Sequence, residues 1–214
     1  MKSQILQLIQ AHPIVAIIRL DDLSQAVSIS QALAAGGLVV QEFTLTNPQA
    51  LKALREVKRA LSASATAAAI GIGSVRSLDE AQAAIEAEAD FIVSPITNVH
   101  IIERCVRSNV AVMPGAFSPT EIANAWDAGA DMVKVFPARG LGPGYIKDVL
   151  APMPYLKLMP TGGIDLSNIH SYFAAGAVAV GIGGNLLDKN AIARGDWQTL
   201  TSAARQYSEA LIHG

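Results

Sequence analysis

Short apolar runs that alternate with longer segments of helical periodicity constrain the fold of this chain more than any other feature. Eight runs of this kind occur, at residues 14–19, 38–45, 66–72, 90–94, 110–114, 132–137, 156–161 and 177–182. The intervening segments, such as "SLDEAQAAIEAEA" at 77–89, repeat apolar residues every three or four positions, which is typical of amphipathic helices. Alternating strands and helices predict a parallel sheet, and uninterrupted apolar runs predict strands that are buried on both faces.

Eight strand–helix units fit closely into the available length, at about 27 residues each. We therefore predict a single-domain α/β protein in which residues 1–214 form one (β/α)8 TIM barrel. An amphipathic helix in "MKSQILQLIQAHP" would precede the first strand. An open, doubly wound sheet is the alternative architecture.

Composition and charge exclude several classes of protein. Hydrophobic residues make up 51% of the chain and charged residues 16%, which predicts a large core and excludes intrinsic disorder. The net charge of -2 and the lack of a Lys/Arg-rich block argue against nucleic acid as a partner. No apolar stretch is long enough to span a membrane, and the N-terminus does not resemble a signal peptide. With one cysteine, Cys105, these features predict a cytoplasmic location.

Polar residues gather near the carboxyl ends of the expected strands, where barrels of this type place their active sites. The sixth run, "MVKVFP", contains Lys134, and the second, "LVVQEFTL", contains Glu42. Because side chains alternate along a strand, packing of Val133 and Val135 against the outer helices would turn Lys134 inward. The same argument turns Glu42 inward, so the two side chains are expected to meet inside the barrel. A buried ion pair is the alternative interpretation, although such pairs stabilise proteins weakly.

A buried lysine next to a carboxyl group suggests covalent catalysis. A free lysine has a pKa of about 10.4, but desolvation in an apolar site lowers the pKa of an amine toward neutrality. A neutral amine can attack a ketone and form a Schiff base while a nearby carboxyl group moves the protons. Lys134 is therefore the candidate nucleophile, and Glu42 is the candidate general acid/base.

Two glycine pairs follow the seventh and eighth runs, in "TGGI" at 161–164 and "GGNLL" at 183–187. Barrels often bind phosphate with these two loops and the N-terminus of a short extra helix. Glycine pairs also mark ordinary turns, but their presence in both loops favours a phosphate site. Asn185 would cap the short helix or contact the phosphate.

No metal site is expected. His12 precedes the first strand, His100 and His170 fall in expected helices, and His213 lies in the tail, so none is expected at the active face. Asp165 is interpreted as a helix N-cap. The sequence "SPTE" predicts a capping box in which Ser118 pairs with Glu121 and Pro119 opens the helix.

The ordered motifs resemble those of a known family. "IVAIIR", "EFTLTNP", "GIGSV", "FIVSP", "MPG", "VKVFPA", "GPGYIKDVLAPMP", "PTGGI" and "GIGGNLL" are similar to motifs of the 2-keto-3-deoxy-6-phosphogluconate (KDPG) and 4-hydroxy-2-oxoglutarate (KHG) aldolases. The resemblance covers essentially the whole chain. It implies a metal-independent class I aldolase, a (β/α)8 barrel that is commonly trimeric, which cleaves KDPG to pyruvate and glyceraldehyde 3-phosphate.

The resemblance also implies roles for individual residues. Lys134 would form the Schiff base and Glu42 would act as the general acid/base. The phosphorylated end of the substrate would lie at the two glycine loops. The resemblance and the positions of residues at the strand ends together predict the substrate-binding residues Arg19, Thr46, Ser74, Pro95, Phe136, Thr161, Gly162, Gly163, Gly183, Gly184 and Asn185.

Three positions depart from the family pattern. Some members carry arginine where this chain has Thr46, some carry threonine in place of Ser74, and serine is frequent at the position of Asn185. Loss of the arginine would remove a strong carboxylate ligand, and Arg19, at the end of the neighbouring strand, is the candidate replacement.

Several alternative functions remain open from the sequence. The galactonate epimer of the substrate (KDPGal) and KHG are alternative substrates, and the sequence does not separate the two sugar configurations. A phosphate-binding isomerase or synthase, or a non-catalytic barrel that binds a phosphorylated sugar acid, would also need glycine loops. The joint presence of Glu42 and Lys134 argues against these last two.

Overall fold

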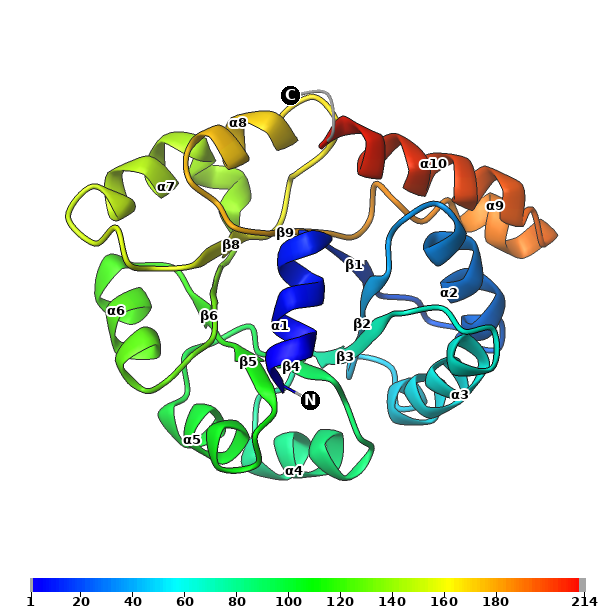
Figure 1. The fold of residues 1–214 in the computed structure, drawn as a ribbon, viewed down its shortest axis with the longest axis horizontal. Coiled ribbons are helices and arrows are strands. Elements are labelled where there is room, and N and C mark those ends of the chain that lie inside the picture. Colours follow the sequence, from blue (N-terminus) through cyan, green and yellow to red (C-terminus); the bar gives the residue numbers. More distant parts are fainter. Residues whose placement is uncertain (1, 212–214) are drawn as a thin grey trace.

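A computed structural model describes residues 2–211 and places parallel strands at the centre of the molecule, with helices around them (Figure 1). The strands are β1 (Ile14–Ile18), β2 (Val40–Thr44), β3 (Ala69–Gly73), β4 (Phe91–Val93), β5 (Ala111–Met113), β6 (Gly115–Ala116), β7 (Val133–Val135), β8 (Leu158–Pro160) and β9 (Val180–Ile182). The helices are α1 (Lys2–Ala11), α2 (Ala26–Ala35), α3 (Ala50–Ala63), α4 (Leu78–Glu86), α5 (Val99–Arg107), α6 (Pro119–Asp127), the 3₁₀ turn η1 (Ala138–Gly140), α7 (Gly142–Leu150), α8 (Ile169–Ala174), α9 (Lys189–Arg194) and α10 (Trp197–Ala210). Each predicted apolar run coincides with a strand, and β3 extends one residue beyond its run, to Gly73.

The strands form two sheets in which every pairing is parallel. One sheet has the order β5-β4-β3-β2-β1-β9, and the other has the order β6-β7-β8. Only Pro114 separates β5 from β6, and a parallel bridge between Thr161 and Gly181 connects the end of β8 to β9. The predicted parallel α/β fold is confirmed.

Side-chain alternation divides the core into two clusters. The inner cluster includes Val15, Val40, Met132 and Met159, whose side chains point away from the surrounding helices. The outer cluster contains the alternate residues of the same strands, among them Phe43, Val133 and Val135, packed beneath the helices. The strand pattern predicts the same division, with Lys134 and Glu42 on the inner side.

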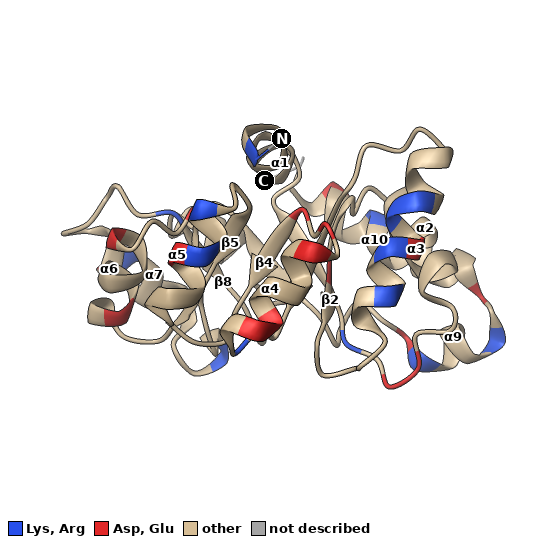
Figure 2. Cartoon of the chain, turned by 90° about the horizontal axis from the view of Figure 1, so that it is seen from below, with Lys and Arg blue, Asp and Glu red and all other residues tan. Residues whose placement is uncertain are grey.

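Helix α1 lies across one end of the strands (Figures 1 and 2). Its Ile9 is fully buried in the inner cluster, and Ile5, Leu6 and Leu8 pack against the same cluster. Lys2 also pairs with Asp131 at 2.9 Å. The amphipathic N-terminal helix therefore covers the end of the strands that lies opposite their carboxyl termini, and leaves the carboxyl end open.

Capping residues mark the ends of several helices. Ser118 and Glu121 form the predicted capping box of α6, with Pro119 in its first turn. Three glycines that follow α2, α6 and α8 adopt left-handed backbone angles, with φ of 93° at Gly37 and 101° at Gly129 and Gly176. These residues end their helices in the way that glycine permits at no steric cost.

One prediction about a helix start is wrong, and one of the two roles considered for Asn185 is excluded. Helix α8 begins at Ile169 and follows Asn168, so Asp165 does not cap it. Asp165 instead accepts hydrogen bonds from the backbone and hydroxyl of Ser167 in the preceding turn. Residues 184–186 form a turn rather than a short helix, and Asp188 caps α9 by accepting from Asn190 and Ala191. Asn185 therefore caps no helix.

Charged residues lie mainly on the outer helices and loops, while the strands carry few (Figure 2). Over residues 2–211, the structure has no helix that is both long enough and apolar enough to cross a membrane.

Candidate active site

A pocket of about 240 Å³ opens at the carboxyl ends of the strands. It contains every residue that the sequence predicted for the site except Thr46, whose hydroxyl instead lies 2.8 Å from that of Thr44. The residues that line it are Ile17, Arg19, Glu42, Thr44, Ser74, Pro95, Lys134, Phe136, Arg139, Thr161, Gly162, Gly163, Ile164, Gly181, Gly183, Gly184 and Asn185. Residues from distant parts of the sequence therefore meet at one end of the strands.

Glu42 is held in a cavity that disfavours its charge. Only 1% of the residue is exposed, and within the described chain its Oε2 has no hydrogen-bond partner. Burial raises the pKa of this carboxyl above its ordinary value near 4.5, and the positive charge of Lys134 opposes that rise. A raised pKa moves a carboxyl group toward the operating pH, which is the direction that general acid/base catalysis favours.

The place of Glu42 depends on a glycine in the neighbouring strand. β2 and β3 pair so that Thr44 lies opposite Gly73, and the carboxyl group of Glu42 lies directly over the Cα of Gly73. A Cβ at Gly73 would overlap Glu42 Oε1. The missing side chain at position 73 thus provides the space that the carboxyl group occupies.

Lys134 lies in the middle of β7 and is only 6% exposed, yet its side chain lines the pocket. Its Nζ lies 5.1 Å from the ring centroid of Phe136, which shares its face of the strand. Within residues 2–211 no carboxylate lies within 4.0 Å of Lys134, so the buried ion pair considered from the sequence does not form. The amine of Lys134 and the carboxyl group of Glu42 therefore face the same pocket without forming an ion pair with each other.

Two hydroxyl groups border the same space. Ser74 follows β3 with φ of 60°, in the left-handed region that residues other than glycine rarely adopt. Strained backbone of this kind is concentrated at functional sites, where surrounding structure holds it in place. Thr161 is 4% exposed and lies against Gly181, where a Cβ would overlap its hydroxyl.

The two glycine loops present free backbone donors. Among the described residues, the N–H groups of Gly162, Gly163, Gly184 and Asn185 donate to no protein acceptor. Two carbonyls of the first loop are already used, since Thr161 O accepts from Ala138 and Gly163 O accepts from Asn168. Gly162 and Gly163 have φ of 100° and 79°, angles that favour glycine. Unpaired N–H groups beside a pocket are suited to bind an anion.

Several lining residues were missed by the sequence reasoning. The predicted residues lie at strand ends and glycine pairs, whereas Arg139 lies on η1, beyond the end of β7. Its position five residues after Lys134, and directly after "VKVFPA", was the available signal. The other missed residues are Ile17, Ile164 and Gly181.

Metal-ligating side chains do not gather in the described part of the chain. No group of three or more His, Cys, Asp or Glu residues there could hold a metal ion. His100 and His170 lie on α5 and α8, as predicted, while His213 lies outside the described residues.

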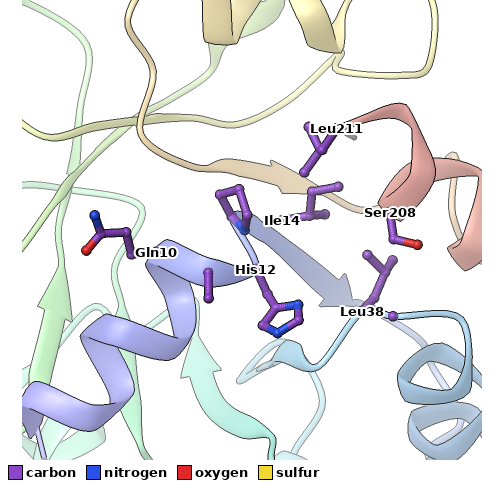
Figure 3. A pocket seen from close by; sticks show the side chains of 9 residues that line it. Gln10, His12, Ile14, Leu38, Ser208 and Leu211 are labelled. Atoms are coloured by element: carbon purple, nitrogen blue, oxygen red, sulfur yellow. The ribbon is translucent and has the colours of Figure 1, made fainter. Parts of the chain in front are cut away.

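A second cavity, of about 510 Å³, lies at the other end of the strands, between α1 and the end of α10 (Figure 3). Gln10, His12, Ile14, Leu38, Ser208 and Leu211 are among its lining residues. It is larger than the pocket that contains Lys134, but none of the described residues that line it is an acid, a lysine or an arginine. We therefore assign the chemistry to the smaller pocket.

Comparisons with known proteins point to one group of enzymes. Residues 5–203 match the family model for KDPG and KHG aldolase. A 2-dehydro-3-deoxy-phosphogluconate aldolase from Treponema pallidum is 32% identical over 202 residues, which cover 94% of this chain and 93% of the relative.

Two solved structures extend the likeness to the fold. A KDPG aldolase from Legionella pneumophila, with pyruvate captured at low pH as a covalent carbinolamine intermediate, has a TM-score of 0.86 at 28% identity. The match covers 96% of this chain and 98% of that one. A native KDPGal structure has a TM-score of 0.82 at 28% identity, and the match covers 93% and 96% of the two chains. The similarity therefore spans nearly the whole molecule.

Proposed function

The chain belongs to the KDPG and KHG aldolase family and is a carbon–carbon lyase, and from that premise we propose that it cleaves KDPG through a Schiff base on Lys134. The products are pyruvate and glyceraldehyde 3-phosphate. The observation that supports this most directly is a buried lysine that lines one pocket with Glu42 and pairs with no carboxylate in residues 2–211. The Legionella relative, with pyruvate bound as a carbinolamine, supports the same chemistry.

The reaction begins when the amine of Lys134 attacks the keto carbon of the substrate and forms a carbinolamine. Glu42 donates a proton to the departing hydroxyl, so that water leaves and a protonated imine remains. Glu42, now ionised, removes the proton of the substrate hydroxyl next to the bond that breaks. The bonding electrons flow into the imine, the aldehyde leaves, and an enamine remains on Lys134. Protonation of the enamine and hydrolysis of the imine release pyruvate and the free amine.

The pocket offers groups for both ends of the substrate. The hydroxyls of Ser74 and Thr161 bind the keto acid, with Pro95 and Phe136 as apolar walls. Arg19 takes the place of the carboxylate-binding arginine, because β1 and β2 are neighbours and Thr46 lies outside the pocket lining. The free N–H groups at Gly162, Gly163, Gly184 and Asn185, next to Gly183, bind the phosphate.

The proposal extends to the architecture. We take the two sheets as one closed eight-stranded barrel, in which β5 and β6 are a single strand interrupted at Pro114 and the Thr161–Gly181 bridge closes the circle. Residues 1–214 would then form one domain. The family resemblance supports a homotrimer, and the single, buried Cys105 is consistent with a cytoplasmic location. Burial raises the pKa of its thiol to about 12, which keeps it unreactive.

Trapping with borohydride tests the mechanism. The protein is incubated with pyruvate and sodium borohydride, and intact-mass measurement and peptide mapping then locate the adduct. We expect one reduced pyruvate adduct on Lys134 and none in Lys134→Arg, with Lys147→Arg as the control lysine on α7. An adduct on another residue, or no adduct in folded protein, would refute the Schiff-base mechanism.

A substrate comparison tests the specificity. Cleavage of KDPG, its galactonate epimer and KHG is followed by coupling pyruvate release to lactate dehydrogenase. The proposal requires the highest kcat/KM for KDPG. A higher value for either of the other two compounds would leave the aldolase chemistry in place and reassign the substrate.

A further inference from the structure

Two arginines border the substrate pocket on opposite sides of the glycine loops. Arg139 follows β7 and Arg19 follows β1. In the order of the strands, β8 adjoins β7, the Thr161–Gly181 bridge joins β8 to β9, and β9 pairs with β1. The loops at 162–163 and 183–185 thus lie between the two arginines, with Arg139 on the side of the first loop.

Direct packing holds Arg139 against this loop. A Cβ at Gly163 would lie 2.9 Å from Arg139 Cβ and 3.0 Å from its Cγ, so the stem of the arginine passes over the bare Cα of Gly163. The backbone of the adjoining Ala138 donates to Thr161 O at 2.9 Å, which ties η1 to the start of the same loop. Arg139 is therefore positioned by the loop whose N–H groups are free.

The charge of Arg139 has no partner in the protein. Among residues 2–211, no carboxylate lies within 4.0 Å of Arg139, and no hydrogen bond from its side chain is formed. Of the described residues that line the pocket, Glu42 is acidic, while Arg19, Lys134 and Arg139 are basic. An anionic ligand with more than one negative charge would balance this arrangement.

We infer that Arg139 is a specificity residue that binds the substrate phosphate together with the Gly162–Gly163 loop. This inference rests on the proposed function and deepens it. A guanidinium can contact two phosphate oxygens at once, while the loop N–H groups donate to the remaining oxygens. Arg19, beside β2 and Glu42, is left for the carboxylate at the other end of the substrate.

The test compares a phosphorylated substrate with its unphosphorylated counterpart. Steady-state kinetics of KDPG and 2-keto-3-deoxygluconate cleavage are measured for the wild type, Arg139→Ala and Arg139→Lys. Arg59→Ala, an exposed arginine on α3 with no ion pair among the described residues, is the matched control. One charge-assisted contact is worth about a ten- to hundredfold change in affinity.

We expect Arg139→Ala to lower kcat/KM for KDPG by about ten- to hundredfold, mainly through KM, and to leave the unphosphorylated substrate unchanged. Arg139→Lys should recover part of the loss, because it keeps the charge but not the paired donors. Inorganic phosphate should inhibit the wild type competitively, with an inhibition constant that rises in Arg139→Ala. An equal loss for both substrates, or no loss for KDPG, would overturn the inference.

Pyruvate trapping separates this inference from the proposed function. Arg139→Ala should form the borohydride-reduced pyruvate adduct on Lys134 at the wild-type rate, since pyruvate carries no phosphate. If the wild type itself forms no adduct, the proposed function fails. If both proteins form the adduct but phosphate selectivity is unchanged, only the assignment of Arg139 is refuted.

Discussion

The surroundings of Glu42 oppose its ionisation, and the position of its carboxyl group depends on the lack of a side chain at Gly73. Its Oε2 is buried without a hydrogen-bond partner in the described chain, and its Oε1 occupies the space above Gly73. Burial of a carboxyl group without a hydrogen-bond partner costs free energy of folding, so selection for stability alone would not favour it. Two substitutions separate the electrostatic and steric parts of this arrangement.

Glu42→Gln should lower the rate of cleavage and, as pH rises, increase the free energy of unfolding relative to wild type. Burial raises the pKa of Glu42, so the stability contributed by the neutral carboxyl is present at low pH and is lost as pH rises through the folded-state value. Glutamine stays neutral, so the free energy of unfolding of the variant relative to wild type should increase as pH rises from about 4 to 8. Urea titrations at several pH values measure this difference, and a difference independent of pH would contradict the prediction. The rate of cleavage should fall by about 10²- to 10⁴-fold.

Gly73→Ala should displace the Glu42 carboxyl group while the chain still folds. We expect kcat to fall on the order of 100-fold, because small misplacements of a catalytic group are costly. Gly71→Ala is the matched control on the same face of β3, since the atoms nearest to its added Cβ belong to the Phe91 ring, whereas those nearest to a Cβ at Gly73 belong to Glu42. Both variants should lose about 1–3 kcal/mol of stability by overpacking. Equal kcat values for the two folded variants would contradict the steric role of Gly73.

At the scale of elements, the capped start of α6 and the packing of α1 at the opposite end of the strands define the surroundings of the pocket. Helix α6 begins with a capping box directly after β6, and the hydroxyl of Tyr145 donates to Phe117 O at 2.6 Å in the same connection. Helix α1 packs on the inner cluster from the opposite end. The carboxyl ends of the strands are thus left free for the site.

Ser118→Ala should destabilise the protein by about 0.5–2 kcal/mol, because the backbone N–H of Glu121 loses its capping acceptor. The comparison is Ser62→Ala, an exposed serine within α3 whose side chain makes no hydrogen bond in the described structure. Denaturant unfolding followed by circular dichroism measures both. Equal effects of the two substitutions would show that the cap contributes nothing.

Ile9→Ala should cost about 2–5 kcal/mol, because Ile9 is fully buried between α1 and the inner cluster. Val106→Ala, at a side chain on α5 that is 40% exposed, serves as the surface control and should have a much smaller effect. If the two substitutions lower the urea midpoint equally, α1 does not contribute to the core in solution.

At the scale of the whole molecule, the C-terminal helix α10 packs against α2, in the N-terminal part of the chain. Helix α10 lies on α2, where Thr201 donates to Ala32 O and Ser208 donates to Gly36 O, at 3.0 and 2.8 Å. A Cβ at Gly36 would lie 2.6 Å from Thr201 O, so this contact requires glycine. Contacts between segments so distant in sequence favour unfolding as one unit.

Equilibrium unfolding should therefore show a single transition. Trp126 on α6 and Trp197 on α10 report on separate parts of the fold. Fluorescence of the Trp126→Phe and Trp197→Phe variants, each compared with its own far-UV circular dichroism, should give coincident curves. A difference between the two probes in either variant would contradict the single-domain proposal.

The sequence by itself determined the features that depend on neighbours along the chain. Apolar runs and helical periodicity located the strands and helices, "SPTE" determined the capping box of α6, and alternation along two strands turned Glu42 and Lys134 to the same side. These signals are local, since the side-chain periods of strands and helices act within a few residues.

Only the tertiary structure decided which groups meet across strands and loops. The overlap of Glu42 with the space above Gly73, the packing of Arg139 on Gly163 and the exclusion of Thr46 from the pocket lining each depend on a neighbouring strand or on the course of a loop. Asp165 was misassigned, and the capping role considered for Asn185 was wrong, for a similar reason, because the position at which a helix begins after a glycine loop depends on how that loop packs. Periodicity gives the direction of a side chain, while the space and partners it finds are set by residues far away in the sequence.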